Sequence, residues 1–398
     1  MLTNRQLFLL HISQTSSAPL MLEIERAKGV FMYSPSGEKY LDLISGVSVS
    51  NTGHGHPRVV EAVRNQAESY MHLMVYGEMI QSPQVQYAAE LARILPPGLD
   101  TCYFVNSGSE AIEGALKLAK RFTGRSRIIY FKNAYHGSTH GAMSIQGSEK
   151  YRSAFRPMLP DTWQINFNDF GGLDAIDHKT ACVVAEPVQA EAGVILPSSG
   201  FLEEIRQRCS ANGALLIFDE AQTGFGRTGA LFASLKFGVT PDIIVLAKAL
   251  GGGMPLGAFI SSKKIMQSLL LKPELGHITT FGGHPVCCAA GLASLRVILE
   301  EKLTEACPAK SALFKNGLKH PIISEIRGEG LLLAVKLTKP EYVSRVISHA
   351  PGYGIILDYF LFCDDAFRIA PPLTISHEEI SYACMQLTLL LDDTMKDV

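Results

Sequence analysis

The middle of the chain contains six short hydrophobic runs with little alternation between apolar and polar positions. Turn residues bound these runs and helical stretches separate them; they lie at 101–108, 127–133, 181–187, 214–220, 242–248 and 256–262. Unbroken hydrophobic runs are typical of strands that are buried on both faces. The pattern therefore predicts a mostly parallel sheet that is covered by helices.

Three successive runs end in a charged residue, namely Glu186, Asp219 and Lys248. Glu186 and Asp219 lie 33 positions apart, and Asp219 and Lys248 lie 29 apart, about the length of one strand-helix-strand unit. In an open parallel sheet the carboxyl ends of the strands line the ligand crevice. We therefore expect a carboxylate and an amine at one edge of one sheet.

The N-terminal quarter of the chain has a different pattern. Residues 29–43 predict two short strands around a Pro-Ser-Gly turn. Residues 57–95 have helical spacing of their apolar positions, which is interrupted near Gly77 and Pro83. These elements precede the predicted sheet.

The pattern changes again after Ser294, where an amphipathic helix begins a C-terminal region that ends in a helix from His377. Between these two helices we expect strands at 330–337, 353–360 and 366–373. The chain is therefore divided into an N-terminal segment that packs with a small domain (1–45), a large domain (46–294) and a small C-terminal α+β domain (295–398).

Composition narrows the class of protein. Of the 398 residues, 47% are hydrophobic and 19% are charged, and the formal net charge is -2. This balance is typical of a globular protein with ample material for a core, and it indicates neither nucleic acid nor an anionic membrane as a partner. No apolar run approaches the length of a membrane span, and the N-terminal LFLLHI is too short for a signal peptide. We therefore expect a cytoplasmic protein.

Cysteine usage is compatible with that location. The eight cysteines show no CxxC spacing, and several lie inside apolar runs. We interpret them as reduced, buried thiols, and a zinc site is not expected.

The segment after the first run is a candidate anion site. Ser107, Gly108 and Ser109 stand where a strand passes into a long amphipathic helix, and their backbone N–H groups could hold a phosphate at the helix N-terminus. The same residues are equally compatible with an ordinary N-cap, with Glu110 or Glu113 in the first turn. The segment alone does not decide between these interpretations.

Eight motifs occur in order between residues 53 and 374: GHGHP, NSGSEA, NAYHGST, AEPVQAEAGV, FDEAQTGFGRTG, LAKALGGGMPLGA, TTFGGHP and FRIAPPLT. In these motifs the chain resembles the class III aminotransferases, which include ornithine, acetylornithine, 4-aminobutyrate and diaminopelargonate transaminases. The resemblance implies an α/β fold of fold type I, with a mostly parallel sheet in the large domain and a small α+β domain. It also implies pyridoxal 5'-phosphate as the cofactor.

The resemblance assigns the central chemistry to two residues. Lys248 matches the lysine that forms a Schiff base with the cofactor and moves the proton between the substrate carbon and the cofactor carbon. Its apolar setting disfavours the ammonium form; the alternative is a lysine that reaches solvent. Asp219 matches the carboxylate that pairs with the pyridine nitrogen, so that the ring accepts electrons. A cap at a strand end is the alternative for Asp219.

Four further residues are expected to hold the cofactor besides the segment 107–109. Gln222 matches the residue that bonds the phenolic oxygen. Tyr135 matches the aromatic residue that stacks on the ring, with His136 beside it; a lone tyrosine after a strand would more often serve packing. Thr280 matches the threonine that reaches the phosphate of the neighbouring subunit, which implies a homodimer with shared active sites.

Arg368 and Glu191 are expected to select substrates. Arg368 matches the arginine that grips a substrate carboxylate through two hydrogen bonds. Glu191 matches the acid that covers this arginine when an end without a carboxylate is bound. Together they would let one pocket accept both an amine and 2-oxoglutarate or glutamate. Glu186 is expected to support the site, and a surface salt bridge is the alternative for Arg368.

Two positions depart from the ornithine and acetylornithine members. Those members commonly have an arginine where this chain has Ser138, and ornithine enzymes have a tyrosine where it has Val47. A substrate carboxylate left unpaired in a desolvated pocket would be costly. We therefore expect a terminal amine or an ω-amino acid as the donor, 2-oxoglutarate as the acceptor and a ping-pong aldimine mechanism. An acetylornithine or ornithine aminotransferase proper is the alternative.

Other classes of protein remain as alternatives. The motif GFGRTG (224–229) formally matches a dinucleotide fingerprint, but AQT separates it from the preceding strand, and Asp242 follows Gly229 too closely, so a dehydrogenase is remote. An aminomutase or lyase could use the same cofactor. A non-catalytic binding protein would be expected to lose Lys248. His54 and His56 could suggest a metal, but GHGHP is a structural turn in the family.

Overall fold

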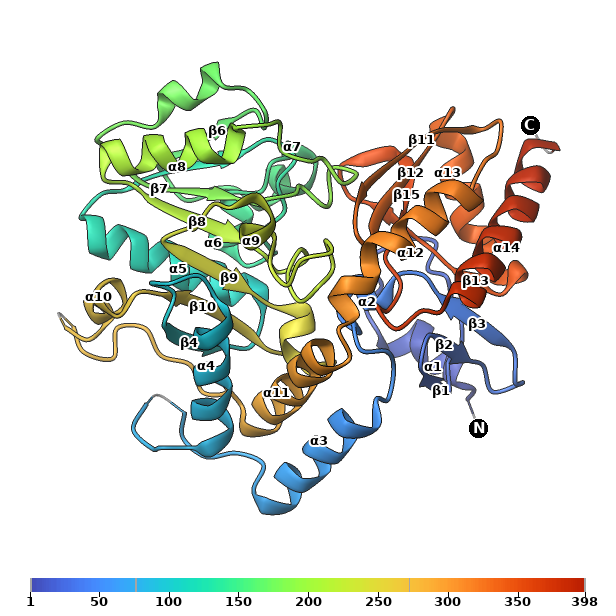
Figure 1. Ribbon diagram of the computed structural model, residues 1–398, viewed down its shortest axis with the longest axis horizontal. Coiled ribbons are helices and arrows are strands. Elements are labelled where there is room, and N and C mark those ends of the chain that lie inside the picture. The colour runs from blue at the N-terminus through green and yellow to red at the C-terminus, as the bar shows by residue number, and fades with distance from the viewer. Residues whose placement is uncertain (1, 76, 272, 397–398) are drawn as a thin grey trace.

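The computed structural model describes residues 2–75, 77–271 and 273–396. Its largest feature is a seven-stranded sheet, which occupies the left part of Figure 1. The strands follow the spatial order β4 (Thr101–Val105), β10 (Gly257–Ser261), β9 (Ile243–Leu246), β8 (Leu215–Asp219), β7 (Thr180–Ala185), β5 (Arg127–Phe131) and β6 (Thr162–Ile165). All six hydrophobic runs of the sequence are therefore strands of one sheet.

The sheet is mostly parallel, as predicted. The pairs β5–β6, β5–β7, β7–β8 and β8–β9 are parallel, whereas β10 is antiparallel to both of its neighbours, β4 and β9. The hydrophobic run of β10 does not reveal its direction because β10 is buried along its whole length, like its parallel neighbours.

Both faces of the sheet are covered by helices, which explains the unbroken hydrophobic runs. Along β7, Cys182 and Val184 face a cluster with α5 (Gly108–Thr123), while Val183 and Ala185 face a cluster with α8 (Phe201–Asn212). Successive side chains of a strand point to opposite faces, so a strand between two helical layers needs apolar residues at every position.

Other helices pack around the edge of this sheet near β4. The interrupted helical stretch forms α3 (Pro57–Ser69) and α4 (Ser82–Ile94), as the pattern predicted. Both contact α11 (Pro285–Glu300), and α11 in turn contacts the 3₁₀ helix η3 (Lys248–Gly251). Four shorter helices complete this part: α6 (His140–Ser144), α7 (Glu149–Arg152), α9 (Ala233–Phe237) and α10 (Lys263–Met266).

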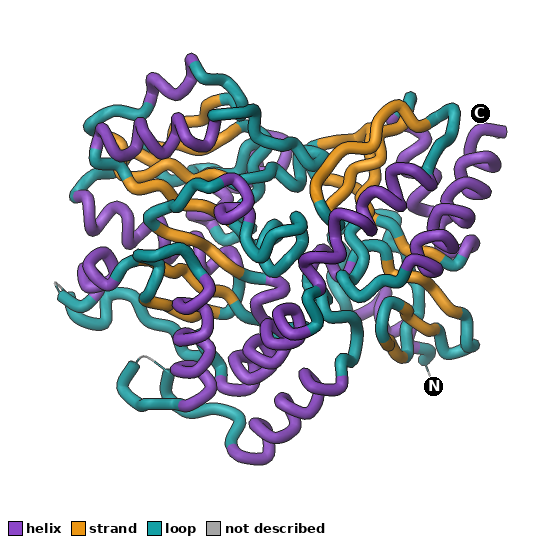
Figure 2. Tube along the Cα trace, in the orientation of Figure 1, coloured by secondary structure: helices purple, strands orange, loops and turns teal. Residues whose placement is uncertain are grey.

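Two smaller sheets lie on the other side of the molecule (Figure 2). The first contains β1 (Arg26–Lys28), β2 (Phe31–Tyr33), β3 (Lys39–Asp42) and β13 (Ile355–Ile356). β2 and β3 are the two short strands that the sequence predicted. Because β13 pairs with β3 in parallel, the two ends of the chain share this sheet.

The second small sheet has the order β11 (Ile323–Glu329), β12 (Leu332–Leu337), β15 (Cys363–Ile369) and β14 (Asp358–Phe360). The helices around the small sheets are α1 (Asn4–His11), α2 (Ser45–Ser48), α12 (Leu303–Gly317), α13 (Pro340–His349) and α14 (His377–Lys396). The sequence pattern missed β11 and α13. The position proposed as a domain boundary, residue 294, lies inside α11, and the division into domains stays a prediction.

Arg227 joins the large sheet's surroundings to the C-terminal region. Its side chain is fully buried, and its guanidinium donates hydrogen bonds to the backbone oxygens of Leu331 and Pro371 and to the side chain of Asn51. Through Arg227 the motif GFGRTG thus connects these distant segments of the chain, and it does not form a turn between a strand and a helix. Among the described residues, no helix combines the length and the apolar composition needed to cross a membrane.

Candidate active site

A cavity of about 550 Å³ opens at the carboxyl ends of β7, β8 and β9, beside the N-terminus of α5. Nine of the predicted site residues line it: Ser107, Gly108, Ser109, Tyr135, His136, Glu191, Asp219, Gln222 and Lys248. Glu186 also lines it. The three charged strand ends that the sequence singled out therefore meet in one cavity, as expected for the carboxyl edge of a parallel sheet.

Lys248 is the first residue of η3, directly after the end of β9 and Ala247. Its backbone has φ 53, in the left-handed region that residues other than glycine rarely adopt. Burial lowers the pKa of Lys248, although the nearby Glu191 acts in the opposite direction. No hydrogen bond or ion pair ties the Lys248 amine to any other described residue. The amine is thus free to react, and its burial disfavours the charged form.

Asp219 ends β8 and is held by two contacts. Its Oδ2 lies 2.8 Å from Nδ1 of His136, and its Oδ1 accepts a hydrogen bond of 3.0 Å from the backbone N–H of Ala221. The second ring nitrogen of His136, Nε2, is buried without a partner among the described residues. Because the carboxylate accepts, His136 carries its proton on Nδ1.

Glu186 lines the cavity and holds two segments of its backbone. Its two carboxyl oxygens accept hydrogen bonds from the backbone N–H groups of Tyr135 (2.9 Å) and Ala190 (3.2 Å). Burial raises the pKa of Glu186 to about 7, although the His136 ring acts in the opposite direction. Glu186 therefore fixes the backbone beside the Tyr135 ring and the start of the loop that carries Glu191.

The segment 107–109 contains the N-cap that one of its two interpretations expects, and its role as a phosphate site stays a prediction. Ser107 is the N-cap of α5, and its Oγ accepts from the N–H of Glu110 at 3.2 Å. The cap satisfies one N–H of the first turn, so other N–H groups of that turn remain available at the positive end of the helix dipole, where Gly108 and Ser109 line the cavity. A Cβ atom on Gly108 would lie 3.2 Å from the Cβ of Ala247, so glycine lets α5 begin close to Lys248.

Arg368 reaches the site from β15 of the small sheet. Its Nη2 lies 2.7 Å from Oε1 of Glu191, and its Nη1 donates to Oε1 of Gln222 at 3.1 Å. The side chains of Arg368 and Glu191 are only 1% and 7% exposed, so the pair is not a surface salt bridge. Burial acts to raise the pKa of Glu191, but the charges of Arg368 and Lys248 together with the hydrogen bonds to Glu191 outweigh it, and the pKa lies below its ordinary value.

Four predicted site residues do not line the cavity, namely Arg368, which bonds to Glu191 and Gln222 of its wall, and Ser138, Val47 and Thr280. Ser138 is exposed, with its Oγ 3.2 Å from the Tyr135 hydroxyl and its N–H bonded to Ser109 Oγ at 2.9 Å. Val47 lies in α2 at φ 63, and Val49 lines the cavity in its place. Thr280 is exposed at the surface, and its contact with a neighbouring subunit stays a prediction.

Asp358 is a charged residue near the site that the sequence did not single out. It lies on β14 directly opposite Arg368 of β15, and burial raises its pKa although Arg368 acts in the opposite direction. Its charge also interacts with Glu191 and Lys248. The sequence signal that could have pointed to Asp358 is its carboxylate inside the apolar run 353–360. The strand register that brings it to Arg368 is visible only in the structure.

The two histidines of GHGHP have separate partners. His54 Nε2 lies 2.7 Å from Asp42, and His56 Nε2 lies 3.5 Å from Glu301. Within the described ranges, no group of three or more histidine, cysteine, aspartate or glutamate side chains is arranged to hold a metal ion.

The cavity residues fit pyridoxal 5'-phosphate. An unpaired lysine amine can condense with an aldehyde, a buried carboxylate can hold a proton on a ring nitrogen, and a helix N-terminus suits a phosphate. The free Nε2 of His136 and the close approach at Gly108 are further features of a site built around a ligand. The sheet and this cavity together define a cofactor-dependent transferase of fold type I.

Comparisons with known proteins give the family. A family model described as Aminotransferase class-III matches residues 12–391. The acetylornithine aminotransferase of Methanosarcina mazei is 39% identical over 368 residues, which cover 90% of this chain and 89% of that protein. This chain belongs to the class III aminotransferases, which depend on pyridoxal 5'-phosphate.

Solved structures agree with that assignment. The ornithine aminotransferase from Toxoplasma gondii ME49 has a TM-score of 0.89 at 31% identity, with 98% of this chain and 94% of that chain covered. The ω-transaminase from Pseudomonas jessenii in complex with PMP has a TM-score of 0.92 at 26% identity, with 100% and 99% covered. The family and the fold exclude the dehydrogenase alternative.

Proposed function

We propose that this aminotransferase takes the amino group from the terminal amine of a small donor and passes it to 2-oxoglutarate, in two half-reactions at one site. The buried pair of Arg368 and Glu191 carries this proposal. Arg368 can bind a substrate carboxylate through two hydrogen bonds, whereas Glu191 neutralises Arg368 when an end without a carboxylate occupies the cavity. A site that serves both an amine and a 2-oxo acid needs both states.

The chain's own residues divide the remaining work. Pyridoxal 5'-phosphate, when bound, supplies an aldehyde for the amine and a ring that accepts electrons. The Lys248 amine takes the proton from the donor carbon that bears nitrogen and returns a proton in the opposite half-reaction. Asp219 would hold a proton on the ring nitrogen of the bound cofactor, and His136 holds Asp219 in place. Gln222 links this group to Arg368.

N-acetylornithine is the first donor to test. Curated relatives from several organisms, 35–39% identical to this chain, carry the name acetylornithine aminotransferase, which favours that alternative over a broad amine donor. Ser138 is the observation that favours the second candidate, an amine or ω-amino acid. Ser138 cannot form the ion pair with the donor's far carboxylate that an arginine there would form.

We also propose a homodimer that places Thr280 of each subunit at its partner's cofactor. The exposed apolar side chains of Ile278 and Phe281, 50% and 54% exposed, flank Thr280 and are suited to a subunit interface. A cytoplasmic location is supported by the cysteines, since all eight are free thiols and six are buried.

A donor panel tests the proposal. Purified protein with pyridoxal 5'-phosphate and 2-oxoglutarate is given N-acetylornithine, ornithine, 4-aminobutyrate and simple alkylamines, and glutamate is measured. Selective use of N-acetylornithine supports the first candidate, and broad use of amines supports the second. Conversion of an amine without any need for a 2-oxo acid would indicate a mutase or lyase and would overturn the proposal.

A further inference from the structure

The turn between β14 and β15 lies against Glu191. This turn consists of Leu361 and Phe362 and is called the hairpin tip below. The N–H of Leu361 donates to Oε2 of Glu191 at 3.2 Å, and the N–H of Phe362 donates to the backbone oxygen of Glu191 at 3.0 Å. The hairpin tip thus holds both the backbone of Glu191 and the carboxylate oxygen that does not face Arg368.

Tyr151 of α7 fixes the hairpin tip from the side of the large sheet. Its hydroxyl donates to the backbone oxygen of Leu361 at 3.0 Å, and its ring meets the ring of Phe362 edge-on, with 5.6 Å between centroids and 67° between planes. In Figure 1, α7 lies on the side of the large sheet that faces the small one. The hairpin tip is therefore clamped between α7 and the loop of Glu191.

Arg327 of β11 holds the same loop two residues further on. Its Nε donates to the backbone oxygen of Gly193 at 2.6 Å. Gly193 and Val194 have φ values of 86 and 58, so the loop turns sharply there. With its backbone fixed at both points, Glu191 can leave Arg368 only by rotation of its side chain.

Rotation of the Glu191 side chain breaks hydrogen bonds that are present while Glu191 covers Arg368. While Glu191 covers Arg368, its carboxylate also accepts from Leu361 and from Gln222. When a substrate carboxylate takes Arg368, Glu191 gives up these bonds together. The Leu361 N–H therefore stabilises the covered state selectively, as far as the hairpin tip holds it in place.

We propose that Tyr151 is a positioning residue that sets the balance between the two states of Glu191, and through it the affinity for 2-oxo acids relative to amines. The inference rests on the proposed roles of Arg368 and Glu191. A firmly held hairpin tip favours the covered state, which suits amines and opposes carboxylates. A ligand that binds only the uncovered state has its apparent affinity reduced by the fraction of protein in that state.

The test measures the two half-reactions separately in Tyr151→Phe. This variant keeps the ring contact with Phe362 and removes only the hydroxyl. The apparent dissociation constant for 2-oxoglutarate should fall by about threefold, because one neutral hydrogen bond no longer holds the tip. The apparent dissociation constant for an amine donor without a carboxylate should stay the same or rise. Tyr40→Phe is the matched control, because it removes a hydroxyl bonded to Glu38 at 3.0 Å and neither residue lines the cavity.

A double substitution identifies the route of the effect. In a Glu191→Ala background, Tyr151→Phe should leave the affinity for 2-oxoglutarate unchanged, because the residue through which it acts is absent. Equal shifts for amine and 2-oxo acid, or a shift that persists in Glu191→Ala, would overturn the inference. Phe362→Leu provides a second variant that loosens the tip if Tyr151→Phe does not fold. Failure of the proposed function itself would look different, since the unsubstituted protein would then transfer no amino group.

Discussion

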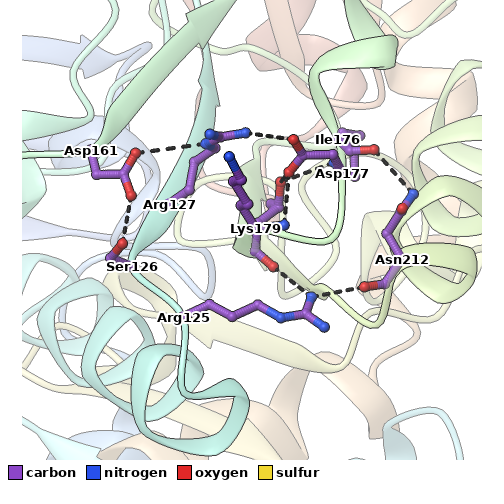
Figure 3. A network of polar contacts seen from close by, with 9 residues as sticks. Arg125, Ser126, Arg127, Asp161, Ile176, Asp177, Lys179 and Asn212 are labelled. Atoms are coloured by element: carbon purple, nitrogen blue, oxygen red, sulfur yellow. Dashed lines mark hydrogen bonds and ion pairs between the residues drawn. The ribbon is translucent and has the colours of Figure 1, made fainter.

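The two edges of the seven-stranded sheet carry charged residues that are arranged in opposite ways. At the amino edge, Arg127 at the start of β5 lies 2.8 Å from Asp177 and 3.6 Å from Asp161 (Figure 3). Its guanidinium also lies 3.9 Å from the centre of the Trp163 ring. At the carboxyl edge the Lys248 amine has no partner among the described residues. The amino edge pairs these charges with each other, whereas the carboxyl edge leaves the Lys248 amine unpaired beside the cavity.

The pKa shifts follow the same division. The pKa of Asp177 is lowered by the N–H of Lys179 and by Arg127, so its charged form is stabilised in the fold. At the carboxyl edge burial works against the charge, since it raises the pKa of Glu186 to about 7 and lowers that of Lys248. Charges that oppose folding are expected where a ligand supplies the missing interactions. At the amino edge of the sheet the charges therefore stabilise the fold, whereas at the carboxyl edge they are available for chemistry.

The sharpest test of this division is Lys248→Ala. Loss of the reactive amine should lower the rate of amino transfer by at least about 10³-fold, since one group serves as nucleophile and as acid and base. The stability of the cofactor-free protein should not fall, because the amine is desolvated and unpaired. Single-turnover kinetics and thermal unfolding measure the two effects. A marked loss of stability without cofactor would show that Lys248 belongs to the scaffold.

Glu186 offers a test through pH. Its folded pKa of about 7 lies above the ordinary glutamate value of 4.5, so its contribution to stability is fully present below about pH 4.5 and is lost as pH rises through 7. The loss is about 3 kcal/mol. Glu186→Gln should remove this part of the pH dependence, and unfolding measured from pH 5 to 8 reports it. Parallel curves for the two proteins would contradict the raised pKa.

Arg127→Met tests the amino edge by removing the cation of its charge cluster. The substitution leaves Asp161 and Asp177 without their cation and should lower the free energy of unfolding by about 1–2 kcal/mol, since both carboxylates are about a third exposed. The rate of amino transfer should stay unchanged, because Arg127 lies at the opposite end of the strands. Denaturant unfolding and steady-state kinetics check the pair of outcomes. A fall in activity with intact stability would contradict the division between the edges.

The difference between the edges also explains how much the sequence could predict. Lys248, Asp219 and Glu186 follow apolar runs at the spacing of strand-helix-strand units, so local pattern was enough to bring them together. Arg368 lies on another sheet, and only the family resemblance pointed to it. The fold was predictable where runs are unbroken, whereas β11 was missed because it is partly exposed and polar.

The parts that were not predictable depend on contacts between distant segments. The antiparallel direction of β10 follows from its connections and not from its composition, which is that of a parallel strand. The hairpin tip became visible as a partner of Glu191 only through backbone N–H groups, which no sequence motif records. Asp358 looked like one polar residue in a strand, and its position opposite Arg368 follows from the register of β14 and β15.

Asp358 extends the comparison to the small sheet with the smallest expected effect. It lacks an ion-pair partner among the described residues and faces Arg368 across the strand pair, so its charge opposes any carboxylate that approaches Arg368. Asp358→Asn should therefore lower the KM for 2-oxoglutarate by about threefold and leave the KM of a simple amine unchanged. Asp365→Asn is the matched control, because Asp365 lies on β15 but pairs with Lys336 at 2.9 Å. If Asp358→Asn raised the KM for 2-oxoglutarate, Asp358 would instead hold Arg368 in position. Its carboxylate would then have a structural role, like the paired carboxylates around Arg127.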